Sequence, residues 1–333
     1  MKILKPRYYD AFQCIASRCP DSCCKEWDVQ VDPVSARRYR MLEGPLGERL
    51  RQVMEQRDED VVMVQENGRC PMWMENGLCR IHGELGEDAL CDVCREFPRL
   101  RHDYGDFVEL GLELSCPEAA RLILSEPAEP GIVMELDEDA EGEYDLQTMD
   151  ILRASRRKAL ALMEDPSVPV NRALAALLLY GYSVQEQIDG GEEAQMDVQG
   201  MLEQAESFRQ DGDEGAVLEF LEGLEILTDA WRQRLQTPWG DGNWDDRLRR
   251  LATYAIGRYW LQAVSDFDIV CRVKLIILFC LAVKILGGEL IQTAQLMSKE
   301  IENNLDNVEA ILDGAYTAAA LTDVRLLDML LKS

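Results

Sequence analysis

Cysteine is the residue type whose placement most clearly suggests chemistry in this sequence of 333 residues. Thiolates bind zinc and iron–sulfur clusters, and neighbouring thiols can form disulfides. Nine of the eleven cysteines lie within the first 116 positions: Cys14, Cys19, Cys23, Cys24, Cys70, Cys79, Cys91, Cys94 and Cys116. The other two, Cys271 and Cys280, lie in an apolar helical stretch, where a thiol is usually a small core residue. The sequence therefore predicts thiol chemistry near the N-terminus and two core thiols elsewhere.

The spacing of the nine cysteines matches no single metal-binding template. Only Cys91 and Cys94 form a C-x-x-C pair, whereas a zinc ribbon usually has two such pairs and a ferredoxin has a denser run. Cys19, Cys70 and Cys116 are each followed directly by proline, which stiffens the turn that leaves a ligand. This pattern favours metal turns over scattered core thiols and leaves iron and zinc open.

The same region also allows chemistry other than metal binding by cysteines alone. A thiol–disulfide role for Cys91 and Cys94 stays an alternative, although no βαβ pattern surrounds them. His82 and His102 also lie in the cysteine-rich region and are able to ligate zinc, but we expect His82 on the surface of a short helix.

Charge and hydropathy exclude several classes of protein. The chain has 35 Lys plus Arg against 62 Asp plus Glu, a net charge of −27, so we expect no nucleic-acid partner. No signal-peptide-like apolar run follows the basic N-terminus, and the most apolar stretch, 269–286, is interrupted by Arg272, Lys274 and Lys284. We therefore expect a cytoplasmic protein with no membrane segment, in which reduced thiols favour metal over disulfides.

The composition changes along the chain and predicts three regions. Residues 1–125 are cysteine-rich and carry a net charge of only −6. Residues 126–145 are rich in Pro and acidic residues and are typical of a linker. Residues 146–333 show helical periodicity almost throughout. We expect an α+β, mostly α, protein: a small loop-rich cysteine-cluster module with short strands, followed by an all-α helical bundle.

Local signals predict particular elements within these regions. Asp32-Pro33 begins a helix to about Met41, Asn76-Gly77 marks a hairpin turn, and Pro117 begins a helix through Leu124. A second helix over 46–56 and strands over 61–64 and 108–114 complete the module. Helical patterns in the second half occupy 147–163, 171–188, 196–209, 213–227, 246–263, 267–286, 289–301 and 306–331.

Four motifs in the cysteine-rich region resemble the flagellin lysine-N-methylase family, part of a wider class of zinc- or iron-chelating cysteine-cluster proteins. The motifs are Pro6-Arg7-Tyr8-Tyr9-Asp10…Cys14…Cys19-Pro20-Asp21-Ser22-Cys23-Cys24-Lys25-Glu26-Trp27, Arg69-Cys70-Pro71…Asn76-Gly77-Leu78-Cys79, Leu90-Cys91-Asp92-Val93-Cys94-Arg95-Glu96-Phe97-Pro98 and Leu114-Ser115-Cys116-Pro117-Glu118. They cover roughly residues 1–125, and their order and spacing are specific.

The resemblance implies methylation of surface lysines on flagellin with S-adenosylmethionine as donor, and a [4Fe-4S] cluster held by module cysteines. The implied ligand pool is Cys19, Cys23, Cys24, Cys70, Cys79, Cys91, Cys94 and Cys116, of which one cubane uses four. The residues themselves do not select these four, nor a catalytic residue or cofactor cradle, since no G-x-G-x-x-G is present. Tyr8, Tyr9, Asp10 and Trp27 are pocket candidates or ordinary packing residues. The alternative function is a non-catalytic zinc- or iron-chelating protein with a helical interaction domain.

Overall fold

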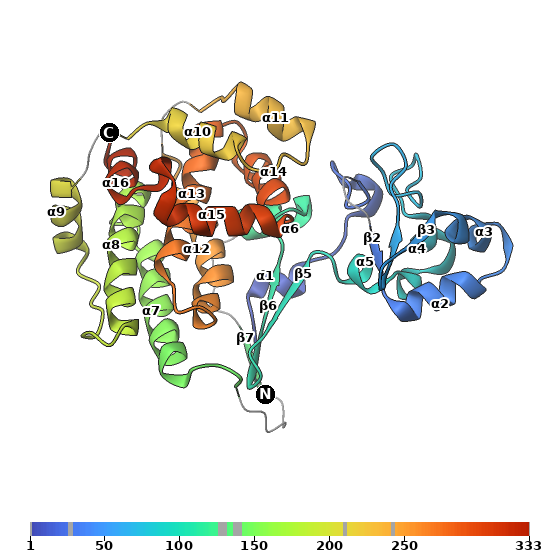
Figure 1. The fold of residues 1–333 in the computed structure, drawn as a ribbon, viewed down its shortest axis with the longest axis horizontal. Helices are drawn as coiled ribbons and strands as arrows, with labels where there is room; N and C mark the ends of the chain where they lie inside the picture. Colours follow the sequence, from blue (N-terminus) through green and yellow to red (C-terminus); the bar gives the residue numbers. More distant parts are fainter. Residues whose placement is uncertain are drawn as a thin grey trace.

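The structure, a computed structural model, describes residues 2–25, 29–125, 132–135, 142–208, 212–240 and 244–332. A smaller part that carries most of the cysteines stands apart from a larger helical part in Figure 1. We name residues 14–98 the cysteine lobe and residues 142–332 the helical body. The fold is α+β and mostly α, as the sequence predicts.

The cysteine lobe is built on a small antiparallel sheet with the strand order β2-β4-β3. The inward side chains of this sheet, such as Met63, are buried against Tyr39 and Leu50 from two helices. The strands are β2 (Val29–Val31), β3 (Met54–Arg57) and β4 (Asp60–Met63). The helices are η1 (Ala16–Arg18), α2 (Pro33–Met41), α3 (Gly44–Val53), α4 (Arg80–Leu85), η2 (Glu87–Ala89) and α5 (Asp92–Glu96).

The predicted helix start at Asp32 is confirmed, and its side chain has a second role. The Asp32 carboxylate accepts hydrogen bonds from the backbone N–H groups of Val34 (3.1 Å) and Ser35 (2.8 Å), which caps α2. It also accepts one from the N–H of Asp92 at 3.0 Å, which ties the start of α5 to α2. Burial alone would raise the pKa of Asp32, but these N–H donors lower it to about 2.

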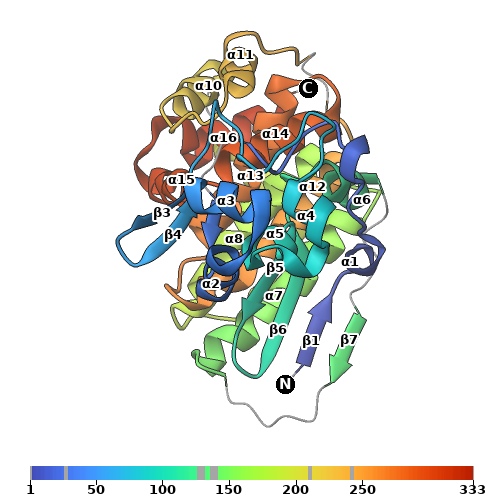
Figure 2. The same ribbon diagram turned by 90° about the vertical axis from the view of Figure 1, so that its right-hand side faces the viewer.

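The second sheet joins the two parts of the chain. Its order is β5-β6-β1-β7, and Figure 2 shows the four strands side by side. β1 pairs with β6 in parallel and with β7 antiparallel. The strands are β1 (Lys2–Lys5), β5 (Arg99–Asp103), β6 (Phe107–Leu112) and β7 (Ile132–Glu135), and the short helix α1 (Arg7–Ala11) follows β1. β6 matches the strand predicted from period-two alternation.

β7 lies inside the stretch that the acidic composition predicts to be a linker. Strand pairing uses backbone groups, so an acidic segment can still supply an edge strand, and Lys2 pairs with Glu135 in the ladder. Residues 126–131 and 136–141 of the predicted linker lie outside the described residues.

The helical body confirms most of the predicted helical periodicity. The helix predicted over 213–227 ends at Glu222, and a helix over Asp229–Gln236 was not predicted. The pattern over 306–331 predicts one helix, but the chain forms α15 and α16, separated by the short η4, because Ala318 (ψ 127°) and Thr322 (ψ 141°) have extended backbones. The helices are α7 (Leu146–Glu164), α8 (Val170–Ile188), α9 (Val198–Phe208), α10 (Glu214–Glu222), α11 (Asp229–Gln236), α12 (Leu248–Tyr259), η3 (Trp260–Val264), α13 (Val270–Leu286), α14 (Leu290–Ile301), α15 (Leu305–Thr317), η4 (Ala319–Leu321) and α16 (Asp323–Leu331).

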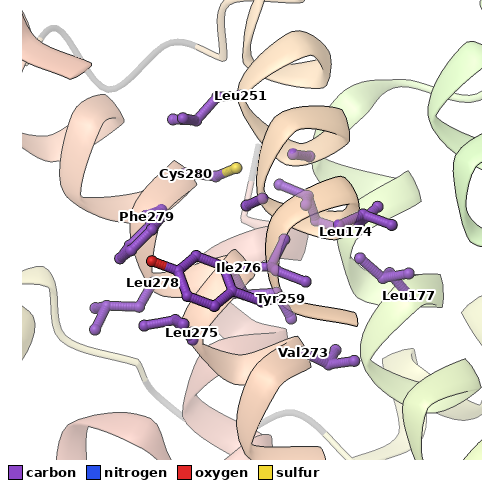
Figure 3. Close-up of a cluster of buried hydrophobic side chains, with 14 of the residues drawn as sticks. Leu174, Leu177, Leu251, Tyr259, Val273, Leu275, Ile276, Leu278, Phe279 and Cys280 are labelled. Carbon is purple, nitrogen blue, oxygen red and sulfur yellow. The ribbon is translucent and has the colours of Figure 1, made fainter. Parts of the chain in front are cut away.

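α13 is the central helix of the body, and it is buried on all sides (Figure 3). Its three basic residues are each paired: Arg272 with Asp266 at 2.9 Å, Lys274 with the Ala315 carbonyl, and Lys284 with a glutamate of α10. No helix in the described part of the chain is long and apolar enough to cross a membrane. The prediction that this stretch is a buried helix, with Cys271 and Cys280 as core thiols, is confirmed.

The buried apolar side chains of the described residues form two separate cores. One lies within the cysteine lobe, and the other fills the helical body. The second core also takes in Phe107, Leu114 and Cys116, together with α6 (Pro117–Ser125), which contacts α12 and α14. The division of the chain at residues 126–145 stays a prediction, and the packing places residues 107–125 with the body.

Candidate metal centre and its junction with the helical body

Cys91 and Cys94 are brought together by the short helix α5. Cys91 precedes the first residue of this helix, and Cys94 is its third residue. The Cys94 thiol donates a hydrogen bond to the Cys91 sulfur, which lowers the pKa of Cys91 and raises that of Cys94. Cys91 is buried and Cys94 half-buried, so this C-x-x-C pair faces the interior of the lobe.

Cys23, Cys24 and Cys70 form a second group of contacting thiols. The backbone N–H of Cys70 donates to the Cys24 carbonyl at 2.7 Å, which holds the two chain segments together. The Cys24 thiol hydrogen-bonds with Cys23 and Cys70, so the pKa of Cys24 rises while that of Cys23 falls to about 7 and that of Cys70 also falls. A thiol with a pKa near 7 is readily available as a thiolate ligand.

These two groups belong to one larger set. The charges of Cys70 and Cys23 raise the pKa of Cys94, after the stronger effects of its contact with Cys91 and of burial. Cys79 precedes α4 and interacts electrostatically with the same two cysteines. Five of the thiols also pack in the lobe's apolar core. The six members of this set, which we name the inner thiols, are Cys23, Cys24, Cys70, Cys79, Cys91 and Cys94.

The remaining predicted ligands are Cys19, which is half-buried in the lobe, and Cys116, which lies outside the lobe. Cys116 belongs to the core of the helical body, and burial raises its pKa to about 12. It interacts electrostatically with Cys19 and with the exposed Cys14, and Cys19 in turn with Cys23. We name Cys14, Cys19 and Cys116 the outer thiols, and Cys19 is the member that interacts with the inner thiols, through Cys23.

The inner thiols have the chemistry that a zinc ion or an iron–sulfur cluster needs. Among the described residues, no three or more His, Cys, Asp or Glu side chains are already arranged to hold a metal ion. The donors are all sulfur, however, and they contact one another in hydrogen-bonded groups. His82 is exposed on α4 as expected, and His102 lies on β5 within the influence of Arg258 and Glu109. The donor type of the inner thiols therefore suits zinc or an iron–sulfur cluster, although no group of three described donors is placed to hold a metal ion.

A polar contact joins the thiol-bearing N-terminal segment to the helical body. Asp21 accepts hydrogen bonds from Gln295 (3.1 Å) and Lys299 (3.3 Å) on α14, and it forms an ion pair with Lys25. Gln295 also donates to the Ser115 carbonyl at 2.7 Å. Although burial would raise the pKa of Asp21, its hydrogen bond to Lys25 and the charge of Lys299 hold it below the usual value. α14 thus positions the segment that carries Cys19 and Cys23.

A buried polar cluster beside this junction was not predicted from the sequence. Glu302 is fully buried and accepts hydrogen bonds from the hydroxyls of Tyr254 (3.1 Å) and Tyr259 (2.8 Å). Arg258 forms an ion pair with Glu302 at 3.2 Å and lies 3.9 Å from Glu113. The one sequence signal was the Tyr-x3-Arg-Tyr spacing on the otherwise apolar face of α12.

In this buried cluster, Glu113 has a pKa close to neutral pH. Burial raises its pKa to about 7, an effect that Glu302 reinforces and Arg258 opposes. Its backbone carbonyl accepts from the N–H of Cys116 at 3.4 Å, so it lies one turn before an outer thiol. A carboxylate with this pKa can accept a proton near neutral pH.

The candidate pocket residues of the N-terminal motif are placed as packing or surface groups. Tyr8 and Tyr9 pack against the core of the helical body, and burial raises the pKa of Tyr8. Asp10 is half-exposed and forms an ion pair with Lys5 at 2.7 Å. Trp27 lies outside the described residues.

Comparisons with known proteins give a distant but consistent result. No family model matches the chain, and no solved structure matches it. The flagellar biosynthetic protein FliU of Salmonella muenchen is 29% identical over 138 residues, which cover 38% of this chain and 78% of that protein. The lysine-N-methylases of Salmonella typhimurium and Salmonella choleraesuis are each 29% identical over 138 residues, and the match spans about a third (33%) of their length. The chain is therefore related, over this stretch, to the flagellin lysine-N-methylase family.

Proposed function

We propose that this protein transfers methyl groups from S-adenosylmethionine to lysine side chains on the surface of flagellin. The observation that carries the proposal is the relationship to proteins named lysine-N-methylase and to a flagellar biosynthetic protein. The acidic surface of the chain, with a net charge of −27, suits a lysine-bearing protein substrate. The reaction is proposed to take place in the cytoplasm.

The inner thiols are the proposed ligands of a [4Fe-4S] cluster. A cubane takes four thiolates, and the six inner thiols offer enough from three separate chain segments, without the buried Cys116. When bound, the cluster would link these segments covalently and so contribute to the stability of the lobe. Zinc is the alternative metal for the same thiols.

The methyl transfer itself requires a neutral lysine amine. The amine nitrogen attacks the methyl carbon, the carbon–sulfur bond of the sulfonium breaks, and its electron pair stays on the sulfur. One proton must leave the lysine ammonium for each methyl group that is added. A carboxylate or the surrounding water can accept this proton.

The metal is tested by purifying the protein without oxygen. The proposal predicts a brown protein with broad absorbance near ~400 nm and about four iron and four sulfide per chain. A colourless protein with stoichiometric zinc would refute the iron–sulfur cluster and leave the methylation open.

Methylation is tested by following a labelled methyl group from S-adenosylmethionine into flagellin. The proposal predicts label in wild-type flagellin and none in flagellin whose lysines have been acetylated beforehand. Label that enters both substrates equally would show that lysine is not the acceptor.

A further inference from the structure

An open hollow lies between α8, α9 and α16, at the end of the helical body away from the cysteine lobe (Figure 1). Its volume is about 990 Å³. Its floor includes Leu179 of α8 and the buried Leu327 of α16. A hollow of this size admits a side chain together with part of the backbone that carries it.

Two aromatic side chains stand at the walls of the hollow. Tyr182 of α8 is 37% exposed, and Phe208 of α9 is 52% exposed. The Tyr182 hydroxyl donates to Asp323 at 2.8 Å, which fixes the ring at the edge of α16. Large exposed aromatic side chains that line a hollow are typical of a binding surface, and their ring faces attract cations.

The charged residues among the described lining of the hollow are all acidic. Glu186, Asp189 and Asp323 line it, and no described lining residue is basic. Asp323 is partly neutralised by Lys274 at 2.8 Å. Within the described part of the chain, neither Glu186 nor Asp189 forms an ion pair. Among the residues that the structure describes, Glu186 and Asp189 are therefore two carboxylates of the hollow without a basic partner.

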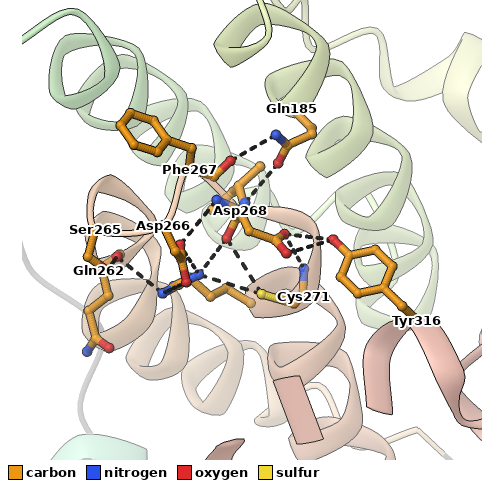
Figure 4. Close-up of polar contacts among 10 residues, drawn as sticks. Gln185, Gln262, Ser265, Asp266, Phe267, Asp268, Cys271 and Tyr316 are labelled. Carbon is orange, nitrogen blue, oxygen red and sulfur yellow. Dashed lines mark hydrogen bonds and ion pairs between the residues drawn. The ribbon is translucent and has the colours of Figure 1, made fainter. Parts of the chain in front are cut away.

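A hydrogen-bonded turn at residues 266–268 is joined to α8 through Gln185 (Figure 4). Gln185, which lines the hollow, donates to the Phe267 carbonyl at 2.9 Å and accepts from the Ile269 N–H at 3.0 Å. These bonds hold Phe267 with a φ of +63° and its ring 47% exposed. Beside it, the hydroxyl of the exposed Tyr316 donates to Asp268 at 2.7 Å. Gln185 is thus shared by the hollow and this turn.

We propose that the hollow binds the cationic side chain of a lysine or methylated lysine on the protein substrate. The aromatic faces and the two uncompensated carboxylates complement an ammonium group, whereas a ligand carboxylate would meet no basic partner among the described lining residues. This inference rests on the proposed function. The hollow lies at the end of the helical body away from the cysteine lobe in Figure 1, so the proposed site would dock the substrate away from the thiol-bearing lobe.

The test measures the affinity of the protein for Gly/Ser peptides that contain one lysine. Calorimetry or fluorescence anisotropy gives this affinity. Peptides with lysine and with trimethyl-lysine are expected to bind, and the peptide with acetyl-lysine is expected not to bind. The double variant E186Q/D189N should weaken binding about fivefold, and F208A should weaken it by a similar factor. The matched control is D306N/E309Q on α15, which removes two exposed charges elsewhere and should leave binding unchanged.

Equal binding of the acetyl-lysine peptide, or equal loss in both double variants, would overturn the proposal. Competition by free S-adenosylmethionine for the same hollow would also overturn it, because the occupant would then be the methyl donor. Peptide binding does not depend on methyl transfer, so the two failures can be distinguished. A wild-type protein that binds lysine peptides but never methylates flagellin retains the docking site and loses the proposed function.

Discussion

At the scale of single residues, the candidate metal site is defined by which cysteine thiols contact one another. Cys91 and Cys94 were predicted as a pair from their spacing, and α5 brings them together as expected. The separation of the inner thiols from Cys14, Cys19 and Cys116 could not be predicted, because it depends on which core each chain segment joins. Glu113 was missed for a similar reason: its partners Arg258 and Glu302 are distant in sequence.

Replacing either Cys91 or Cys94 by serine should remove most of the bound metal, because a serine hydroxyl is a poor ligand for iron–sulfur clusters and zinc. Metal content per chain, measured by elemental analysis after anaerobic purification, checks this. Cys280→Ser is the matched control, since that thiol is buried in the helical body and should leave the metal unchanged. Full metal content in both C91S and C94S would clear these residues as ligands.

Glu113 should make folding stability depend on pH. Its folded-state pKa of about 7 exceeds the ordinary value of 4.5, so between these pH values the folded state keeps a proton that the unfolded state has lost. Its contribution is therefore favourable at low pH and is lost as the pH rises from about 4.5 to 7, on the order of 3 kcal/mol. Denaturant unfolding of wild type and E113Q across this range should give curves that diverge by this amount. Parallel curves would contradict the raised pKa.

At the scale of elements, local signals were read correctly where the element is determined by its own residues. Asp32-Pro33 begins α2, period-two alternation marks β6, and the apolar run forms α13. The strands β1, β2, β5 and β7 were missed because each has only three to five residues and is formed by pairing within a sheet. The helix predicted over 46–56 was wrong at its end, because residues 54–57 form β3, which pairs with β4. The break between α15 and α16 was missed because the apolar periodicity continues through it.

Asp32→Ala should lower the free energy of unfolding by about 1–2 kcal/mol, since it removes the cap of α2 and the contact with Asp92. Chemical denaturation of the metal-free protein measures this. Glu43→Ala is the matched control, because Glu43 precedes α3 without capping it through its side chain, and its loss should change stability by less than about 0.5 kcal/mol. Equal effects of the two substitutions would show that the Asp32 contacts contribute nothing particular.

At the scale of the whole molecule, two separately packed parts are joined by the second sheet and by the contact of Asp21 with α14. Charge follows the same division, since the cysteine-rich region carries −6 of the net −27. This unequal distribution of charge is read directly from the sequence. The packing of residues 107–125 with the helical body could not be predicted from it. That packing places Glu113 and Cys116 at the junction between the two parts.

The double variant Q295A/K299A should release the N-terminal thiol segment from α14, because both contacts with Asp21 are lost. Hydrogen–deuterium exchange should rise over residues 19–25 and stay unchanged in α2 and α3. Lys158→Ala, which breaks an ion pair with Glu193 elsewhere in the body, is the control. Unchanged exchange over residues 19–25 in the double variant would show that α14 does not position this segment.

The most direct measurement of the central claim is peptide mapping of flagellin by mass spectrometry after incubation with S-adenosylmethionine and the anaerobically prepared protein. Wild type and C280S are expected to add methyl groups to surface lysines, and C91S and C94S are expected to add few or none. Flagellin that stays unmodified with the wild-type protein, with its metal intact and the methyl donor still present, would contradict the account.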